Sequence, residues 1–101
     1  MERRNPARAP LYQTKKYKDL VGRLAANVRR LREARGWTQE VAAGKARGME
    51  TVHYRAVETQ RANFTAVTVA RLCEAFGVDV LELFAPAEPP AKRGRGRPRS
   101  E

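Results

Sequence analysis

The sequence predicts one small, compact all-α domain of five helices, flanked by two flexible basic tails. All six prolines lie in residues 1–19 or 86–101, whereas residues 20–85 contain no proline and nearly all of the branched aliphatic residues. Apolar residues of this middle region recur at steps of three and four, and no segment shows sustained strand-type alternation. We therefore place a basic N-terminal arm at residues 1–17, the domain at 18–85 and a Pro/Arg/Gly-rich tail beyond it.

The first two helices follow from apolar spacing and from their end signals. The apolar stripe of the first helix consists of Leu20, Val21, Leu24, Val28 and Leu31. This helix ends near Arg35, because Gly36 is a typical stop. Thr38 can cap a second, short helix that extends to about Ala46. The second helix presents the weakly apolar residues Val41, Ala42 and Ala43.

The third helix follows a tight turn. Arg47 and Gly48 form that turn, and the helix extends from Met49 to about Thr59. Its inner face carries Tyr54 and Val57. Two short helices joined by a glycine turn therefore follow one longer helix.

The fourth and fifth helices are both short. Asn63 or Thr65 can cap the fourth, and Gly77 ends it. Its apolar residues are Ala66, Val69, Leu72, Cys73 and Phe76, and the cysteine is expected to be a buried, inert thiol. Asp79, with Glu82 three residues later, forms a capping-box pattern for a fifth helix that extends through Phe84.

Charge is the strongest compositional signal. The chain carries 21 Lys and Arg against 11 Asp and Glu, which gives a formal net charge of +10. Residues 23–61 contain nine of the basic residues, whereas residues 72–85 contain three acidic residues and no basic one. We expect a two-sided domain with one face suited to a polyanion. The alternative is a basic protein whose charge serves only solubility.

Several classes of protein are excluded by composition. One cysteine and one histidine cannot provide an internal disulfide or a zinc site with three or four ligands. No phosphate-binding glycine loop or nucleophile motif occurs, so we expect no enzyme, no cofactor and no metal. No apolar run approaches the roughly 20 residues of a membrane span, and no signal peptide is evident. A cytoplasmic, nucleoid-associated protein is expected.

A helix, a glycine turn and a second short helix form the arrangement that places one helix in the major groove of DNA, which is about 12 Å wide. Residues 20–85 resemble the Cro/repressor-type (Xre-like) helix-turn-helix family. The matching residues are, in order, Arg32, Arg35, Gly36, Thr38, Gln39, Gly48, Glu58, Ala75 to Val78, Leu83 and Phe84. The segment from Thr38 to Glu58 is one residue longer than is usual in the family, which indicates an insertion in or near the second helix.

The resemblance implies which residues contact DNA. The groove-facing positions of the third helix are Thr51, Val52, His53, Arg55 and Ala56. Among these, Arg55 best fits the O6 and N7 edge of guanine, whereas Val52 and Ala56 can only touch thymine methyl groups. For His53, a surface residue without a role is an equally good interpretation. The resemblance also implies that Gln39, Gln60, Arg61 and Asn63 contact phosphates. It further implies an internal ion pair between Arg32 and Glu58.

Two further features point to partners. The apolar residues Val78, Val80, Leu81, Leu83 and Phe84 exceed what one very short helix can bury, which predicts a homodimer interface. In the tail, Arg95, Gly96, Arg97 and Pro98 resemble an AT-hook, in which arginines lie in a narrow A·T minor groove. The alternative is a solvated basic tail that binds any polyanion.

The sequence thus predicts a sequence-specific, double-stranded DNA-binding transcriptional regulator, a repressor that occupies a promoter. Two alternatives remain open. One is an antitoxin that binds a toxin partner and regulates its own operon, and the other is an architectural, nucleoid-type DNA binder.

Overall fold

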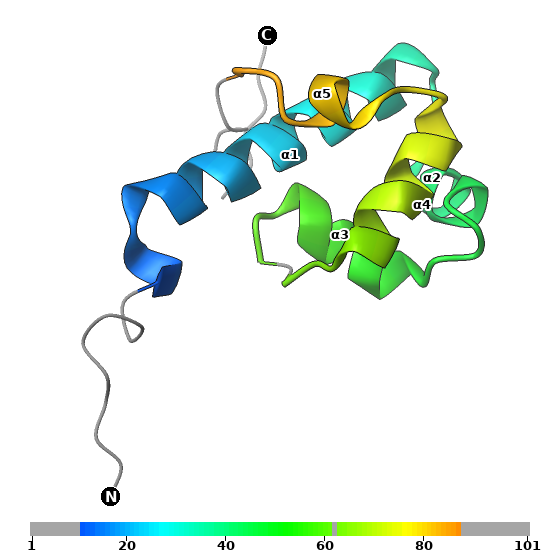
Figure 1. The fold of residues 1–101 in the computed structure, drawn as a ribbon. Helices are drawn as coiled ribbons and strands as arrows, with labels where there is room; N and C mark the ends of the chain where they lie inside the picture. Colours follow the sequence, from blue (N-terminus) through cyan, green and yellow to red (C-terminus); the bar gives the residue numbers. More distant parts are fainter. Residues whose placement is uncertain (1–10, 62, 88–101) are drawn as a thin grey trace, which may run out of the picture.

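The computed structural model of the chain describes residues 11–61 and 63–87, and this part is all-helical, as predicted (Figure 1). The elements are a 3₁₀ helix η1 (Leu11–Gln13), α1 (Lys15–Ala34), α2 (Gln39–Lys45), α3 (Thr51–Glu58), α4 (Ala66–Phe76) and α5 (Val80–Leu83). The minor-groove candidates Arg95 to Pro98 lie outside the described residues.

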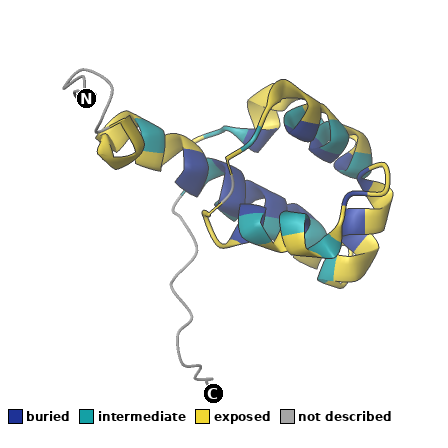
Figure 2. Ribbon diagram, turned by 90° about the horizontal axis from the view of Figure 1, so that it is seen from below, coloured by how far each residue is buried: buried dark blue, intermediate teal, exposed yellow. Residues whose placement is uncertain are grey.

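One hydrophobic core joins the five α-helices. The long helix α1 packs against α3, α4 and α5, while α2 packs against α3 and α4. The buried cluster comprises Leu24, Val28, Leu31, Ala42, Ala43, Ala46, Met49, Tyr54, Val57, Leu72, Phe76 and Leu83. Figure 2 shows these buried positions on the sides of the helices that face one another. Because α3 is held from two directions, only its remaining side can face solvent.

Helix α1 begins at Lys15, more than one turn before Leu20, the first residue of its predicted apolar stripe. Thr14 provides the cap, since its Oγ1 accepts a hydrogen bond of 3.1 Å from the Tyr17 amide. The first turns of α1 project beyond the other α-helices (Figure 1). Leu20, expected in the apolar stripe, is consequently 47% exposed. Helical structure therefore starts within the stretch 1–17 that composition assigned to an arm.

The structure identifies the cap residues of α2 and α4. The Val41 amide donates to Thr38 Oγ1 over 3.1 Å, as expected for the cap of α2. Thr65, and not Asn63, occupies the cap position of α4. Val41 was expected to face inward with its alanine neighbours, but it is 42% exposed, because Ala42 and Ala43 form the buried side of α2.

Two polar side chains fix the ends of helices to the core. Asn27 on α1 is 2% exposed and donates from Nδ2 to the carbonyl oxygens of Leu83 (2.9 Å) and Ala85 (3.0 Å). This contact ties the end of α5 to α1. Arg35, just after α1, donates to the carbonyl oxygen of Phe76 over 2.8 Å. The ends of α4 and α5 are therefore held to α1 by hydrogen bonds as well as by apolar contact.

Candidate nucleic-acid interface

The turn between α2 and α3 sets the direction in which α3 leaves. Arg47 and Gly48 both have positive φ angles, of 60° and 74°. Glycine adopts this conformation without a steric penalty, which explains its position in the turn. The Met49 amide donates to the Ala43 carbonyl oxygen over 3.0 Å, so the turn folds back onto α2. Helix α3 is thereby anchored at its start.

The sides of α3 differ in burial. Tyr54 and Val57 are 0% and 2% exposed, respectively, and both belong to the core. On the opposite side, Val52 is 68% exposed and Arg55 is also exposed. The other three predicted base-reading residues, Thr51, His53 and Ala56, are half-buried. All five predicted residues therefore belong to one helix, but Val52 and Arg55 are its most accessible members.

The predicted ion pair between Arg32 and Glu58 is present in the structure and lies between α1 and the end of α3. Arg32 Nε donates to Glu58 Oε2 over 2.7 Å, and Arg32 Nη2 donates to Oε1 over 3.1 Å. The Glu58 side chain is 4% exposed and that of Arg32 is 14% exposed. A bidentate, desolvated pair of this kind is short and directional. It fixes the C-terminal end of α3 to α1.

Two further donors complete the surroundings of the Glu58 carboxylate. The Tyr54 hydroxyl donates to Oε2 over 2.7 Å, and the Gln39 Nε2 donates to Oε1 over 3.1 Å. Burial by itself raises the pKa of Glu58, but the hydrogen bonds from Arg32, Tyr54 and Gln39 and the charge of Arg32 outweigh it. The pKa of Glu58 consequently lies below its ordinary value. Burial, together with the hydrogen bond to Glu58, raises the pKa of Tyr54 far above its usual range.

Gln39 was predicted to contact a phosphate, yet the structure also gives its side chain two partners inside the domain. Its Nε2 reaches Glu58, and its Oε1 accepts a hydrogen bond of 3.1 Å from Arg55 Nε. Sequence reasoning missed this link, because residues 39 and 55 are brought together only by the packing of α2 on α3.

The loop after α3 carries the other predicted phosphate contacts. Gln60, Arg61 and Asn63 are all exposed. Gln60 has a φ of 63°, and the Arg61 amide donates to the Ala56 carbonyl oxygen over 2.9 Å. The loop therefore begins by folding back onto α3. This places a basic side chain next to the end of the helix.

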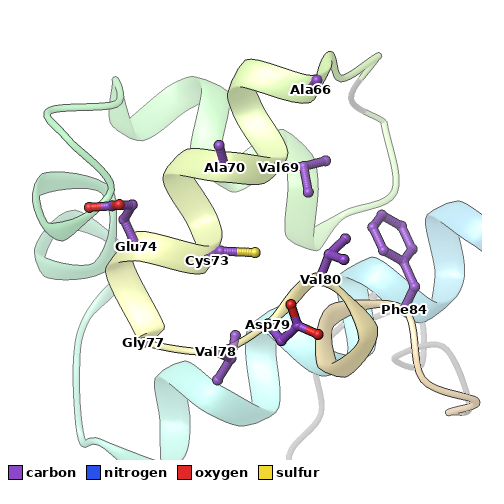
Figure 3. A pocket seen from close by; sticks show the side chains of 10 residues that line it. All are labelled: Ala66, Val69, Ala70, Cys73, Glu74, Gly77, Val78, Asp79, Val80 and Phe84. Carbon is purple, nitrogen blue, oxygen red and sulfur yellow. The ribbon is translucent and has the colours of Figure 1, made fainter.

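A shallow apolar groove lies between α4 and α5 (Figure 3). Its lining includes Val69, Cys73, Val78, Val80 and Phe84, with Glu74 and Asp79 among the polar members. Cys73 was expected to be buried, but it is only half-buried, because it lines this groove. Its partial burial and the nearby carboxylates Asp79 and Glu74 raise the pKa of its thiol, as in an unreactive cysteine.

Four of the five predicted dimer residues retain exposed or partly exposed surface, and Leu81 is 76% exposed. The prediction was wrong for Leu83. It is 0% exposed, because it packs into the core between α1 and α4. Leu83 therefore has no surface to offer a partner.

Two kinds of feature are absent from residues 11–61 and 63–87. No helix there is both long and apolar enough to span a membrane. Among these same residues, no three His, Cys, Asp or Glu side chains are grouped so that they could hold a metal ion.

Comparison with known proteins agrees with this geometry. The helix-turn-helix domain family matches residues 23–84. Among solved structures, the chain is similar to the crystal structure of hypothetical transcription factor NHTF from Neisseria, with 33% sequence identity and a TM-score of 0.63. That match covers 66% of this chain and 76% of the other. No curated protein matches the chain. The chain belongs to the Cro/repressor-type (Xre-like) helix-turn-helix family of DNA-binding domains.

Proposed function

We propose that the protein is a sequence-specific transcriptional regulator that represses by occupying a promoter, with α3 in the major groove of double-stranded DNA. The observation that carries this proposal is the two-sidedness of α3. Its inner side is fixed by the core and by the ion pair of Glu58, whereas Val52 and Arg55 face solvent. The similarity to a hypothetical transcription factor supports the same function.

Within this proposal the residues of α3 have different tasks. Arg55 reads guanine, because its guanidinium fork fits the O6 and N7 acceptors. Val52 and Ala56 contact thymine methyl groups, and Thr51 bonds to a base edge or touches a methyl group. His53, which is half-buried, lies at the margin of the contact. The exposed loop residues Gln60, Arg61 and Asn63 bind phosphates and set the register without reading sequence.

We also propose that the protein acts as a homodimer through α5 and the neighbouring groove. Leu81 and Val80, which are 76% and 43% exposed, respectively, would be covered by the second copy together with Val78 and Phe84. A two-fold dimer requires a pseudo-palindromic operator with half-sites about one helical turn apart. Residues 95–98 would add contacts in a flanking A·T minor groove.

The test of this function is selection of bound fragments from random double-stranded DNA with the full chain. On the selected operator, Arg55→Ala should weaken binding about 5- to 150-fold and change binding to random DNA little. Arg29→Ala is the matched control, because it removes an equal charge from α1, where Arg29 pairs with Glu33 over 3.2 Å. Affinity that is equal for all fragments would reject the regulator and favour an architectural DNA binder.

A further inference from the structure

We infer that Gln39 is a positioning residue that holds the guanidinium of Arg55 ready for a base, and that it links DNA recognition to the buried Arg32–Glu58 pair. This inference rests on the proposed function, in which Arg55 reads a base edge. It assigns to Gln39 a task beyond the predicted phosphate contact.

The orientation of the Gln39 amide is set by its two neighbours. Its Nε2 lies 3.1 Å from Glu58 Oε1, and its Oε1 lies 3.1 Å from Arg55 Nε. A carboxylate can only accept hydrogen bonds, and a guanidinium can only donate them. Turning the amide by 180° would set donor against donor and acceptor against acceptor. Only one of the two amide orientations satisfies both neighbours.

This orientation of Gln39 leaves only one end of the Arg55 guanidinium for DNA. Because the Nε–H group is occupied by Gln39, the part of the guanidinium that remains for DNA is the end formed by Nη1 and Nη2. That end is a planar fork that matches the O6 and N7 acceptors of guanine. An exposed arginine otherwise samples many rotamers and loses this freedom on binding. A side chain held in place before binding loses less.

Gln39 also connects the restraint on Arg55 to the interior of the domain. Gln39 is half-buried at the first residue of α2, between the exposed Arg55 and the buried carboxylate of Glu58. Glu58 is fixed in turn by the two hydrogen bonds from Arg32 on α1. The position of the base-reading side chain therefore depends on three helices, and a change in the buried pair should reach DNA specificity through Gln39.

The experiment is a double-mutant cycle in the full chain, measured on the selected operator and on the same operator with the guanine assigned to Arg55 replaced by each other base. Gln39→Ala should reduce discrimination for that guanine about 3- to 10-fold. In the Arg55→Ala background, Gln39→Ala should cause no further loss of discrimination. Gln39→Met, which keeps the length of the side chain but removes the amide, should behave as Gln39→Ala does. Thermal unfolding of each variant shows whether a loss of discrimination arises from a loss of folded protein.

Two results would overturn the inference, and they are distinguishable. If Gln39→Ala weakens binding to all sequences equally, adds to the effect of Arg55→Ala and lowers the salt slope by about one phosphate contact, Gln39 is a phosphate contact only. In that case the proposed function stands. If Arg55→Ala alone leaves base discrimination unchanged, Arg55 reads no base, and its role in the proposed function fails together with the inference.

Discussion

Replacing Glu58 with alanine tests how α3 is held in place. The substitution removes one carboxylate that accepts hydrogen bonds from Arg32, Tyr54 and Gln39. The Arg32 side chain, which is 14% exposed, keeps its hydrogen bond of 3.0 Å to the Trp37 carbonyl oxygen but loses its buried counter-charge. The hydroxyl of the fully buried Tyr54 loses the acceptor that the structure gives it.

The expected cost is large for a domain of this size. Breaking a buried ion pair from one side destabilises a protein by about 3–5 kcal/mol, against a total stability of about 5–15 kcal/mol. About 1 kcal/mol shifts the melting temperature of a small domain by about 4–8 °C, so Glu58→Ala should lower it by at least about 12 °C. Circular dichroism at 222 nm during heating measures this change directly.

A matched control separates buried from exposed pairs. Lys15 and Asp19 also form an ion pair, at 3.2 Å, but their side chains are 86% and 48% exposed. Asp19→Ala should therefore change stability by less than about 1 kcal/mol. An unchanged melting temperature for Glu58→Ala, equal to that of the control, would refute the role given to the buried pair.

A triple variant tests whether unpaired polar groups cause the loss. Combining Glu58→Leu with Arg32→Met and Tyr54→Phe removes the charges and the hydroxyl together. Well-packed apolar replacements of a buried pair are often neutral in stability. The triple variant should consequently be more stable than Glu58→Ala. If the triple variant is no more stable than Glu58→Ala, lost packing and not an unpaired charge explains the destabilisation by Glu58→Ala.

Four further outcomes are expected. The pKa of Glu58 is lower in the folded state than its ordinary value of 4.5. The stability that ionised Glu58 contributes is therefore complete above about pH 4.5 and is lost as the pH falls further. Glu58→Gln should consequently lose less unfolding free energy than the wild type over that acidic range. Sedimentation at tens of micromolar should show a dimer that Leu81→Asp dissociates, and a wild-type monomer both with and without DNA would contradict the proposed interface. Deleting residues 91–101 removes five positive charges and should weaken binding to many sequences and reduce its salt dependence. Gly96→Leu should weaken binding only to operators flanked by A·T tracts. If Gly96→Leu leaves affinity for those operators unchanged while the deletion lowers it, the tail is a plain basic segment and not an AT-hook.

The helices were predictable because their information is local. Apolar steps of three and four residues, the caps at Thr38 and Thr65 and the stop at Gly77 are all legible in the sequence. Periodicity does not show what packs against a helix, however. Leu20 continues the apolar stripe of α1 but is exposed, because the first turns of that helix project beyond the other α-helices.

At the candidate site, the buried ion pair was predictable from the sequence, whereas the link between α2 and α3 was not. The family resemblance placed Arg55 on the groove-facing helix and paired Arg32 with Glu58. The bridge through Gln39 depends on how α2 packs on α3, which no local pattern reveals. Leu83 was assigned to a dimer interface because it lies in an apolar run, yet its side chain is buried in the core of the monomer.

Methylation interference on the selected operator shows whether α3 reads bases in the major groove. Methylated N7 of guanine projects into the major groove, and methylated N3 of adenine into the minor groove. We predict that N7 methylation of one guanine in each half-site blocks binding of the full chain and that Arg55→Ala removes this interference at that guanine. Interference confined to adenine N3, or an N7 pattern unchanged by Arg55→Ala, would contradict the account.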